Sequence, residues 1–330
     1  AFGNAGQKCS ACSLLLVERS VYEDKNFQDK LKDAATSIKV GSVWEAGNVV
    51  GPMITNRNDK LLQALTLEPG ESWLVPPKFI DEKQYILAPT VKWGVKPGSY
   101  SFRTKLFGPM LSVACIDNLQ QGIELVNSLD YGLTSGLQSL DENEQKLWKD
   151  SILAGNLYIN RGITGAIVNR QPFGGMKLSA FGGGVKAGGP NYCACLVKIT
   201  DKPESNTDYK QSYPHAYEEE FAHARDINKL YGEQNAFRYL PLKNMVLRLF
   251  PGDSNEEAEM IALATKLCHT PLTISFDPND DRTTALSSTG CTLKKETLDE
   301  FLKTMRSYER IRTCGADIPM EMYEEAARRN

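Results

Sequence analysis

The stretch Ala1-Phe-Gly-Asn-Ala-Gly-Gln-Lys-Cys-Ser-Ala-Cys-Ser13 places a thiol, Cys9, among glycine, alanine and serine, and an apolar run at residues 14–17 follows it. Small residues let the backbone approach a ligand closely, and free N–H groups can stabilise the oxyanion that forms when a thiolate attacks a carbonyl. Most intracellular cysteines are instead small buried hydrophobes, and composition alone favours that interpretation. Cys9-x-x-Cys12 could also be a redox pair, although no thioredoxin-like context follows it.

The length and amino-acid composition are those of an ordinary globular protein. Its 330 residues are enough for two domains, and 41% hydrophobic and 24% charged residues are typical values. The net charge of −3 does not indicate a nucleic-acid partner. Eight cysteines are too sparse for a disulfide scaffold, and three histidines, none near a cysteine pair, argue against zinc. We therefore expect no metal, no membrane span, no signal peptide and a cytoplasmic location.

Both ends of the chain look interrupted. No initiator methionine is present, and Ala1 begins inside what reads as a structured loop. Residues 320–329 read as a helix that no strand follows. We expect the chain to be a fragment of a longer polypeptide.

Helix and strand patterns alternate along the chain, which is typical of an α/β fold with a mostly parallel sheet. Basic residues outnumber acidic ones before residue 200 and the reverse holds after it, which indicates a boundary there. No G-x-G-x-x-G follows a strand in the second part, so dinucleotide binding is not expected there. Helices are predicted over residues 26–38, 118–126, 143–154, 218–230, 255–268 and 295–304. Strands are predicted over residues 131–138, 156–160, 243–250, 271–276 and 309–313, and around Cys193 and Cys195.

Residues 161–190 form a long glycine-rich segment. Such a segment could be a flexible linker, or a binding loop whose exposed N–H groups hold an anion. The interleaved Ile167, Val168, Pro172 and Phe173 are more apolar than linkers usually are, so the composition favours a binding loop.

Motifs in four regions point to one family. The string Gly-Gln-Lys-Cys9-Ser-Ala-Cys resembles the catalytic-cysteine motif of aldehyde dehydrogenases, most closely of the Δ1-pyrroline-5-carboxylate (L-glutamate γ-semialdehyde) dehydrogenase branch. Leu106-Phe-Gly-Pro109 resembles the family's E-[IL]-F-G-P turn. Thr164-Gly-Ala166 and Gln171-Pro-Phe-Gly-Gly175 resemble the aldehyde anchor loop of that branch and the P-F-G-G segment behind it. Lys186-Ala-Gly-Gly-Pro-Asn-Tyr192 resembles the ending of the branch.

The resemblance implies a fold in two parts. Residues 1–200 are expected to be the cysteine-bearing half of an aldehyde dehydrogenase catalytic domain, a three-layer α/β/α sandwich. Residues 201–213 are expected to be a linker, and residues 214–330 a smaller, truncated Rossmann-like α/β domain. Residues 201–330 are more loosely similar to the C-terminal domain of bifunctional proline utilisation A proteins, in which a proline dehydrogenase domain precedes the aldehyde dehydrogenase.

The resemblance also implies an activity, the NAD-dependent oxidation of L-glutamate γ-semialdehyde to L-glutamate in proline catabolism. Cys9 would be the nucleophile, passing through a thiohemiacetal and a thioester. The substrate's α-carboxylate would bind Ser10 and the backbone N–H groups of Gly165 and Ala166. Phe173 would pack on the aliphatic middle of the substrate.

On the cofactor side the resemblance places Phe107 beside the nicotinamide. The family's glutamate two residues before it, which holds the nicotinamide ribose, is Lys105 here. An ammonium cannot accept hydrogen bonds from ribose hydroxyls, so NAD binding is expected to be weakened or rearranged. The family's nucleotide-binding domain and general-base glutamate lie upstream of the cysteine and outside this chain, so we expect the chain alone to be inactive.

The implied partners are the aldehyde substrate, other copies of the full-length protein in a homo-oligomer, and a proline dehydrogenase domain on the same polypeptide. FAD would be bound only if that domain lies upstream. One alternative is a non-catalytic scaffold or pseudoenzyme of the same fold, which Lys105 and the absent upstream half suggest. Another is an aldehyde dehydrogenase of different specificity, against which the Thr164-Gly-Ala166 loop argues because a neutral aldehyde has no carboxylate to anchor.

Overall fold

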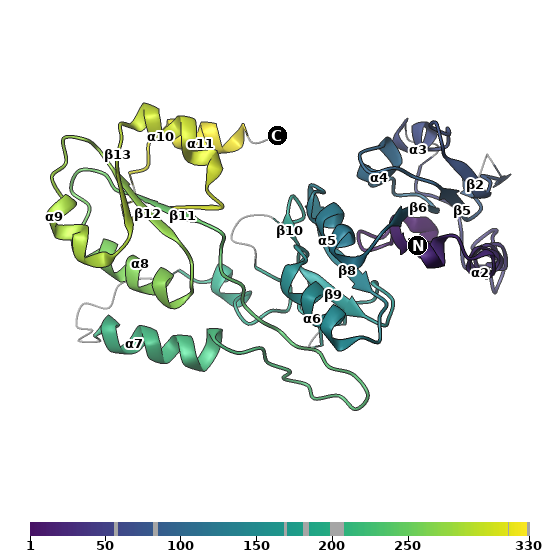
Figure 1. The fold of residues 1–330 in the computed structure, drawn as a ribbon, viewed down its shortest axis with the longest axis horizontal. Coiled ribbons are helices and arrows are strands. Elements are labelled where there is room, and N and C mark those ends of the chain that lie inside the picture. The colour runs from purple at the N-terminus through teal and green to yellow at the C-terminus, as the bar shows by residue number, and fades with distance from the viewer. Residues whose placement is uncertain are drawn as a thin grey trace. The chain divides into compact units, whose positions relative to one another are not determined.

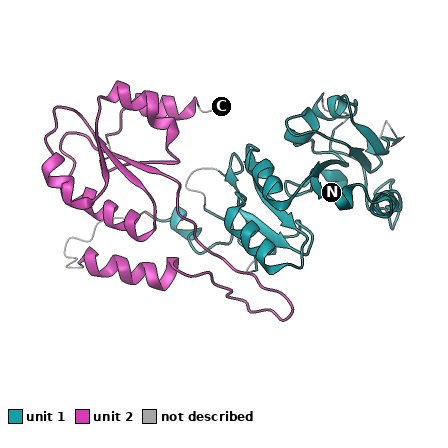
Figure 2. Cartoon of the chain, in the orientation of Figure 1, with its two compact units in different colours: residues 1–197 teal, residues 198–330 magenta. Residues whose placement is uncertain are grey.

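The computed structural model describes residues 1–55, 59–81, 85–167, 170–180, 185–198, 208–315 and 317–328. The chain divides into two compact units, residues 1–197 and 198–330 (Figure 2). Each unit combines helices with a four-stranded sheet (Figure 1).

The first unit is built on a mixed sheet with the strand order β1-β6-β5-β2. The central strand β6 pairs in parallel with β1 and β5, and β2 is antiparallel to β5. Six of the seven residues of β6 are buried, as expected for a parallel strand that is covered on both faces. The strands are β1 (Leu14–Glu18), β2 (Ser72–Val75), β5 (Thr90–Trp93) and β6 (Met110–Ile116).

Helices and two-stranded ribbons complete this unit. The pairs β3–β4 and β7–β10 are antiparallel and β8–β9 is parallel. These strands are β3 (Phe79–Asp81), β4 (Ile86–Leu87), β7 (Tyr131–Gly132), β8 (Thr134–Leu137), β9 (Asn156–Ile159) and β10 (Met176–Lys177). The helices are η1 (Gly3–Gly6), α1 (Arg19–Tyr22), α2 (Lys25–Thr36), α3 (Asp59–Ala64), α4 (Tyr100–Arg103), α5 (Leu119–Asn127), α6 (Glu142–Ser151) and η2 (Cys193–Leu196).

Alternate residues of β1 enter two different hydrophobic cores, because successive side chains of a strand point to opposite faces of the sheet. Leu15 and Val17 join the core that contains α2 and α3 residues. Leu14 and Leu16 join the core that contains residues of α4 and α5. The sheet therefore lies between two helical layers, which is the expected α/β/α arrangement.

The helices predicted over residues 26–38, 118–126 and 143–154 are present as α2, α5 and α6. Each begins after a residue whose side chain accepts a backbone N–H of the first turn. Asp24 accepts from Asn26 at 2.9 Å, and Asn118 accepts from Gln121 at 2.9 Å. Asp141 caps α6 in the same way. Such caps satisfy N–H groups that have no partner inside the helix.

The second unit is built on a fully parallel sheet with the order β13-β12-β11-β14. In chain order this is 3-2-1-4, the arrangement of a Rossmann-like half, which confirms the expected Rossmann-like domain. The strands are β11 (Met245–Arg248), β12 (Leu272–Phe276), β13 (Thr292–Lys295) and β14 (Arg310–Thr313). The helices are α7 (Tyr209–Ala216), η3 (Tyr217–Phe221), α8 (Asn255–Leu267), α9 (Thr283–Leu286), η4 (Ser287–Thr289), α10 (Leu298–Thr304), η5 (Met305–Ser307) and α11 (Met320–Ala327).

The two faces of this sheet are covered by different helices. Met245 and Leu247 pack in the core formed with α8 and α9, while Val246 packs in the core formed with α10 and α11. The first turn of α8, which follows the first strand, carries Glu256 and Glu257. Two carboxylates at a helix N-terminus disfavour the pyrophosphate that binds there in dinucleotide-binding domains. This agrees with the missing glycine fingerprint.

The helix predicted over residues 218–230 is wrong. Residues 209–221 form α7 and the π-turn η3, and the chain then leaves the helical path. Asp226 accepts the backbone N–H groups of Asn228, Lys229 and Asn235, the last two at 3.0 Å. These local bonds compete with a helix for the same donors, and they lower the pKa of the Asp226 carboxyl.

Smaller differences have local causes as well. Cys193 and Cys195 lie in the 3-10 helix η2 rather than in a strand. The helix predicted from residue 295 begins at Leu298, because Thr297 and Glu300 form a capping box there. Residues 209–213 of the expected linker belong to α7, and its residues 201–207 lie outside the described part of the chain.

Candidate functional site

Cys9 lies at the surface in a tight turn just before β1. The turn is closed by a hydrogen bond from the backbone N–H of Ala11 to the carbonyl of Lys8 at 3.1 Å. Ser10 and Ala11 are only 6% and 8% exposed, whereas the Cys9 residue is exposed and its thiol is free. The turn therefore buries the residues after Cys9 and presents Cys9 itself to solvent.

Cys12 differs from Cys9. Its thiol donates to the carbonyl of Leu14 at 3.3 Å, and burial raises its pKa. A buried, protonated thiol is poorly reactive. The two cysteines of the C-x-x-C string therefore have different environments, and Cys9 is the one that a ligand can reach.

The backbone before Cys9 follows a left-handed path with φ of +54° at Asn4, +51° at Ala5 and +68° at Gly6. A β-carbon on Gly6 would lie 2.0 Å from the carbonyl oxygen of Gly108. Only glycine fits at such a contact. The cysteine loop and the Leu106–Pro109 turn, about a hundred residues apart in sequence, are thus brought into direct backbone contact.

Lys105 also joins these two segments. Its Nζ donates to the carbonyl oxygen of Ala11 at 2.7 Å and lies 5.2 Å from the centre of the Phe107 ring. Burial lowers the pKa of Lys105, while the nearby Cys12 and Cys9 raise it. Phe107 is 45% exposed and has a φ of +50°, so its ring is available to a ligand beside the cysteine loop. Cys9, Lys105 and Phe107 are therefore parts of one cluster.

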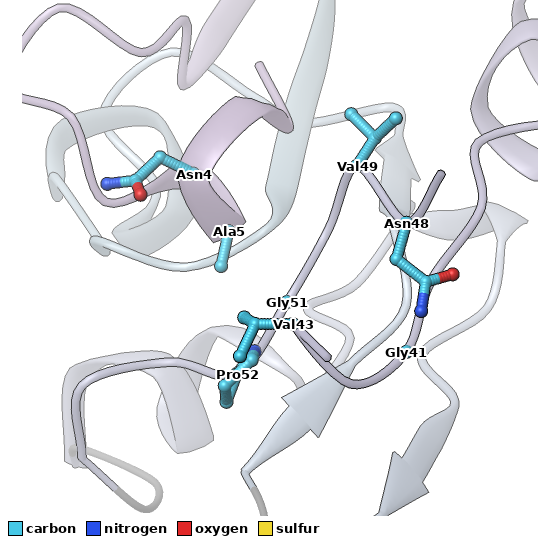
Figure 3. Close-up of a pocket in the computed structure, with 8 residues that line it drawn as sticks. All are labelled: Asn4, Ala5, Gly41, Val43, Asn48, Val49, Gly51 and Pro52. Atoms are coloured by element: carbon cyan, nitrogen blue, oxygen red, sulfur yellow. The ribbon is translucent and has the colours of Figure 1, made fainter. Parts of the chain in front are cut away.

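The loop of residues 41–54 packs beside this cluster. The side-chain oxygen of Gln7 accepts the backbone N–H of Ile54 at 3.0 Å. A cavity of about 230 Å³ lies between η1 and this loop, with Asn4 and Ala5 on one side and the loop residues on the other (Figure 3). It is lined by Asn4, Ala5, Gly41, Val43, Asn48, Val49, Gly51 and Pro52.

The backbone of the expected anchor loop turns at Gly165. Gly165 has a φ of +86°, and a β-carbon there would meet open space. Ala166 is exposed and Thr164 is half-buried. Among the described residues, no partner accepts the backbone N–H of Gly165 or Ala166. Two adjacent free N–H groups can hold a carboxylate.

Phe173, the other expected substrate contact, is held in a rigid frame. It exchanges two backbone hydrogen bonds of 2.9 Å with Ala187. The side chain of Asn156 donates to the carbonyl of Pro172 at 3.0 Å and accepts the N–H of Gly174 at 3.1 Å. The segment around Phe173 is therefore bonded on both sides.

Lys186 also holds this segment. Its Nζ donates to the carbonyls of Gly155 and Gly174, the latter at 2.9 Å, and burial lowers its pKa to about 8. A β-carbon on Gly155 would lie 1.9 Å from the carbonyl oxygen of Gly174. The sequence motifs included Lys186 but did not indicate its structural role, and they did not point to Asn156 at all.

The expected site residues thus form two clusters, each held by its own contacts. Cys9, Ser10, Lys105 and Phe107 belong to one, and the described residues Gly165, Ala166 and Phe173 lie in the other, the glycine-rich segment. Among the described residues no three His, Cys, Asp or Glu side chains gather as metal ligands. In the same part of the chain, no helix combines the length and apolar character needed to cross a bilayer.

An α/β unit that presents one exposed thiol beside an aromatic Phe-Gly-Pro turn is suited to nucleophilic chemistry on a carbonyl. Residues 1–200 match the model of the aldehyde dehydrogenase family, and the chain belongs to that family. The family membership and the mixed α/β fold expected from the motifs are therefore confirmed.

Two curated relatives carry the name 1-pyrroline-5-carboxylate dehydrogenase. The protein from Geobacillus kaustophilus is 34% identical over 194 residues, and that from Bacillus licheniformis is 35% identical over 196 residues. The matches cover 58% and 59% of this chain and 37% of each relative. The chain thus spans little more than a third of their length.

Solved structures agree with the sequence relatives. Proline utilisation A from Corynebacterium freiburgense matches with a TM-score of 0.74 and 36% identity, over 90% of this chain and 34% of its own. A Thermus 1-pyrroline-5-carboxylate dehydrogenase with bound NAD matches with a TM-score of 0.54 and 32% identity, over 59% of this chain and 37% of its own. Because the first match covers 90% of the chain, it includes residues of both units.

Proposed function

We propose that the polypeptide containing this chain oxidises L-glutamate γ-semialdehyde to L-glutamate with NAD⁺, with Cys9 as the nucleophile. The observation that carries the proposal is the exposed Cys9, in a turn that Lys105 contacts and that follows the close approach of Gly6 to Gly108. The names of the relatives supply the substrate and the place in proline catabolism.

In the proposed reaction the Cys9 thiolate forms a bond to the aldehyde carbon, and the carbonyl oxygen becomes the oxyanion of a thiohemiacetal. The Cys9 backbone N–H and a side chain from an upstream segment stabilise this oxyanion. Loss of hydride from the carbon leaves a thioester, and water then releases L-glutamate and the thiol. NAD⁺ accepts the hydride when it is bound. The base that activates the thiol and the water also comes from an upstream segment, so residues 1–330 alone are not expected to turn over.

The substrate's far end is assigned to the anchor loop. The free N–H groups of Gly165 and Ala166 would bind the α-carboxylate together with Ser10, and Phe173 would contact the methylene groups between the two ends. Charge-assisted hydrogen bonds to a carboxylate are the strong ones, which makes this loop the source of specificity. The low exposure of Ser10 makes its contribution smaller than that of the two N–H groups.

The proposed specificity has a direct test. We expect the complete gene product to oxidise L-glutamate γ-semialdehyde with kcat/KM at least about tenfold higher than for pentanal, since each hydrogen bond to a charged group contributes about 1.5–3 kcal/mol. Steady-state NADH formation measures both reactions. Equal values for the two aldehydes would contradict the role of the anchor loop, because pentanal lacks the carboxylate.

The second candidate function is a non-catalytic scaffold, and Lys105 is the observation that favours it. The exposed ring of Phe107 fits a nicotinamide, but the Lys105 ammonium, bonded to the Ala11 carbonyl, cannot accept ribose hydroxyl hydrogens. A weakly bound cofactor or none at all would follow from this.

Calorimetry with NAD⁺ distinguishes the two functions. If the protein is an enzyme, Lys105→Glu in the complete gene product should lower the dissociation constant of NAD⁺ by about tenfold, because the carboxylate accepts ribose hydroxyl bonds. Lys105→Met is the matched control, since it removes the ammonium without adding an acceptor and should improve binding less. Absence of NAD⁺ binding in the wild-type protein and in Lys105→Glu alike would support the scaffold.

The proposal also extends to the parts of the full-length polypeptide outside this chain. The match to proline utilisation A supports a proline dehydrogenase domain on the same polypeptide. We also propose that this domain, where it lies upstream, binds FAD and that the full-length protein is a homo-oligomer. The intact mass of the native protein measures whether that domain is present.

A further inference from the structure

A second cavity, of about 480 Å³, lies in the second unit between α7 and α8, which run side by side (Figure 1). Its size is within the range of small-molecule sites, which are typically concave and mostly apolar with a few polar groups. The lining residues come from α7 and η3, the segment before β11 with the first residue of that strand, α8 and the turn after it, and β14. They are Tyr213, Tyr217, Phe221, Tyr239, Leu240, Pro241, Leu242, Met245, Met260, Ile261, Ala264, Thr265, Cys268, His269, Thr270 and Arg312.

One wall of this pocket is aromatic and held in place before any ligand binds. Tyr213, Tyr217 and Phe221 are spaced four apart, and on an α-helix such residues drift by about 40° per step. The i→i+5 bond from Ala222 to Tyr217, 2.9 Å long, widens the last turn and offsets the drift. Tyr239 supports Phe221 at 4.8 Å between ring centres.

The polar groups of the pocket differ in whether they are already hydrogen-bonded to the protein. The hydroxyl of Thr265 donates to the carbonyls of Ile261 and Ala262, both at 3.0 Å, and that of Thr270 accepts the N–H of Leu242 at 3.2 Å. These hydroxyls are therefore already engaged by the protein.

Arg312, by contrast, is exposed at the pocket on β14, and within the described part of the chain no hydrogen bond or ion pair of its guanidinium is found. A free guanidinium beside an apolar pocket is complementary to a carboxylate, to which it can donate two parallel hydrogen bonds.

We propose that this pocket binds a small molecule with an apolar body and one carboxylate, the body between α7 and α8 and the carboxylate on Arg312. This site is independent of the proposed aldehyde chemistry, because the residues of this chain that are assigned to that chemistry lie in the first unit. No residue of the pocket has a role in that chemistry, so the two proposals can fail separately.

Dodecanoate is the probe for this site, and its binding to the full chain is measured by displacement of the fluorescent anion 1-anilinonaphthalene-8-sulfonate. Arg312→Gln should raise the dissociation constant of dodecanoate by about tenfold, the loss expected for hydrogen bonds to a charged group. Arg310→Gln is the matched control, because Arg310 lies two residues earlier on the same face of β14 and does not line the pocket. The dissociation constant of dodecanoate for Arg310→Gln should equal that for the wild type. The dissociation constant of 1-dodecanol, which has no carboxylate, should be the same for Arg312→Gln and the wild type.

Two further measurements locate the probe. Ala264→Trp should fill the cavity and abolish dodecanoate binding. If Ala264→Trp has a lower melting temperature than the wild type, Met260→Trp is used instead to fill the cavity. Dodecanoate should also slow the alkylation of Cys268, which lines the pocket, but not that of the exposed Cys193 in the first unit.

The proposal is overturned if dodecanoate does not bind, if it binds Ala264→Trp as well as the wild type, or if Arg312→Gln and Arg310→Gln behave alike. A wild-type dimer in sedimentation that Ala264→Trp converts to a monomer would also overturn it, since the occupant would then be a second copy of the chain.

Discussion

Replacing Cys9 with alanine is expected to lower kcat/KM for L-glutamate γ-semialdehyde in the complete gene product by about 10³-fold or more. In the proposed reaction the Cys9 thiolate supplies the bond that holds the aldehyde carbon during hydride loss. The described turn 8–11 offers no second thiol to replace it, and the hydroxyl-bearing Ser10 is buried. NADH formation at saturating NAD⁺ measures the loss. Calorimetry should show that NAD⁺ still binds, because Cys9 does not hold the cofactor.

Cys12→Ala is the matched control within the same C-x-x-C string. Its thiol is buried and bonded to the Leu14 carbonyl, so its removal should change kcat/KM by less than about tenfold, the cost of one lost contact. An active Cys9→Ala enzyme would contradict the proposed mechanism. Loss of activity in Cys12→Ala equal to that in Cys9→Ala would point to a redox pair instead.

The second large effect is structural. Gly6→Ala should lower the free energy of unfolding of the first unit by about 3 kcal/mol, because an alanine β-carbon would collide with the carbonyl oxygen of Gly108 at 2.0 Å. The residue also has a φ of +68°, which costs an L-residue roughly a further 1 kcal/mol. Neither atom belongs to a flexible side chain, so the strain must move the backbone of the cysteine loop or of the Phe107 turn.

The measurement can be restricted to the first unit. All four tryptophans, Trp44, Trp73, Trp93 and Trp148, lie before residue 198, so tryptophan fluorescence during urea unfolding reports this unit alone. Gly3→Ala is the control in the same 3-10 turn, since a β-carbon on Gly3 meets nothing within 4 Å, and it should change stability by less than about 0.5 kcal/mol. Equal stability of the two variants would show that the close approach of Gly6 and Gly108 is absent.

The interpretation of Lys105 changes between sequence and structure. In the sequence it is only a missing carboxylate on the cofactor side. In the structure its ammonium donates to the carbonyl of Ala11 inside the cysteine turn, so Lys105 connects the cysteine motif with the Phe-Gly-Pro turn. Restoring glutamate would therefore exchange one interaction for another.

Local patterns were sufficient for much of the fold. The alternation of strand and helix, and capping residues such as Ser254 before α8, depend on interactions within a few residues. The prediction of a helix over residues 218–230 was wrong because of another local interaction. The composition of these residues suits a helix, but the carboxylate of Asp226 takes the N–H groups that the helix needs.

The sequence by itself determined the family and the α/β class, because these depend on motif strings and on hydrophobic periodicity. Only the tertiary structure decided which segments meet. The contact of Gly6 with Gly108, the bond from Lys105 to Ala11 and the pocket between α7 and α8 all join residues far apart in the chain. Such contacts depend on how the sheets and helices pack, and no local pattern along the chain encodes that packing.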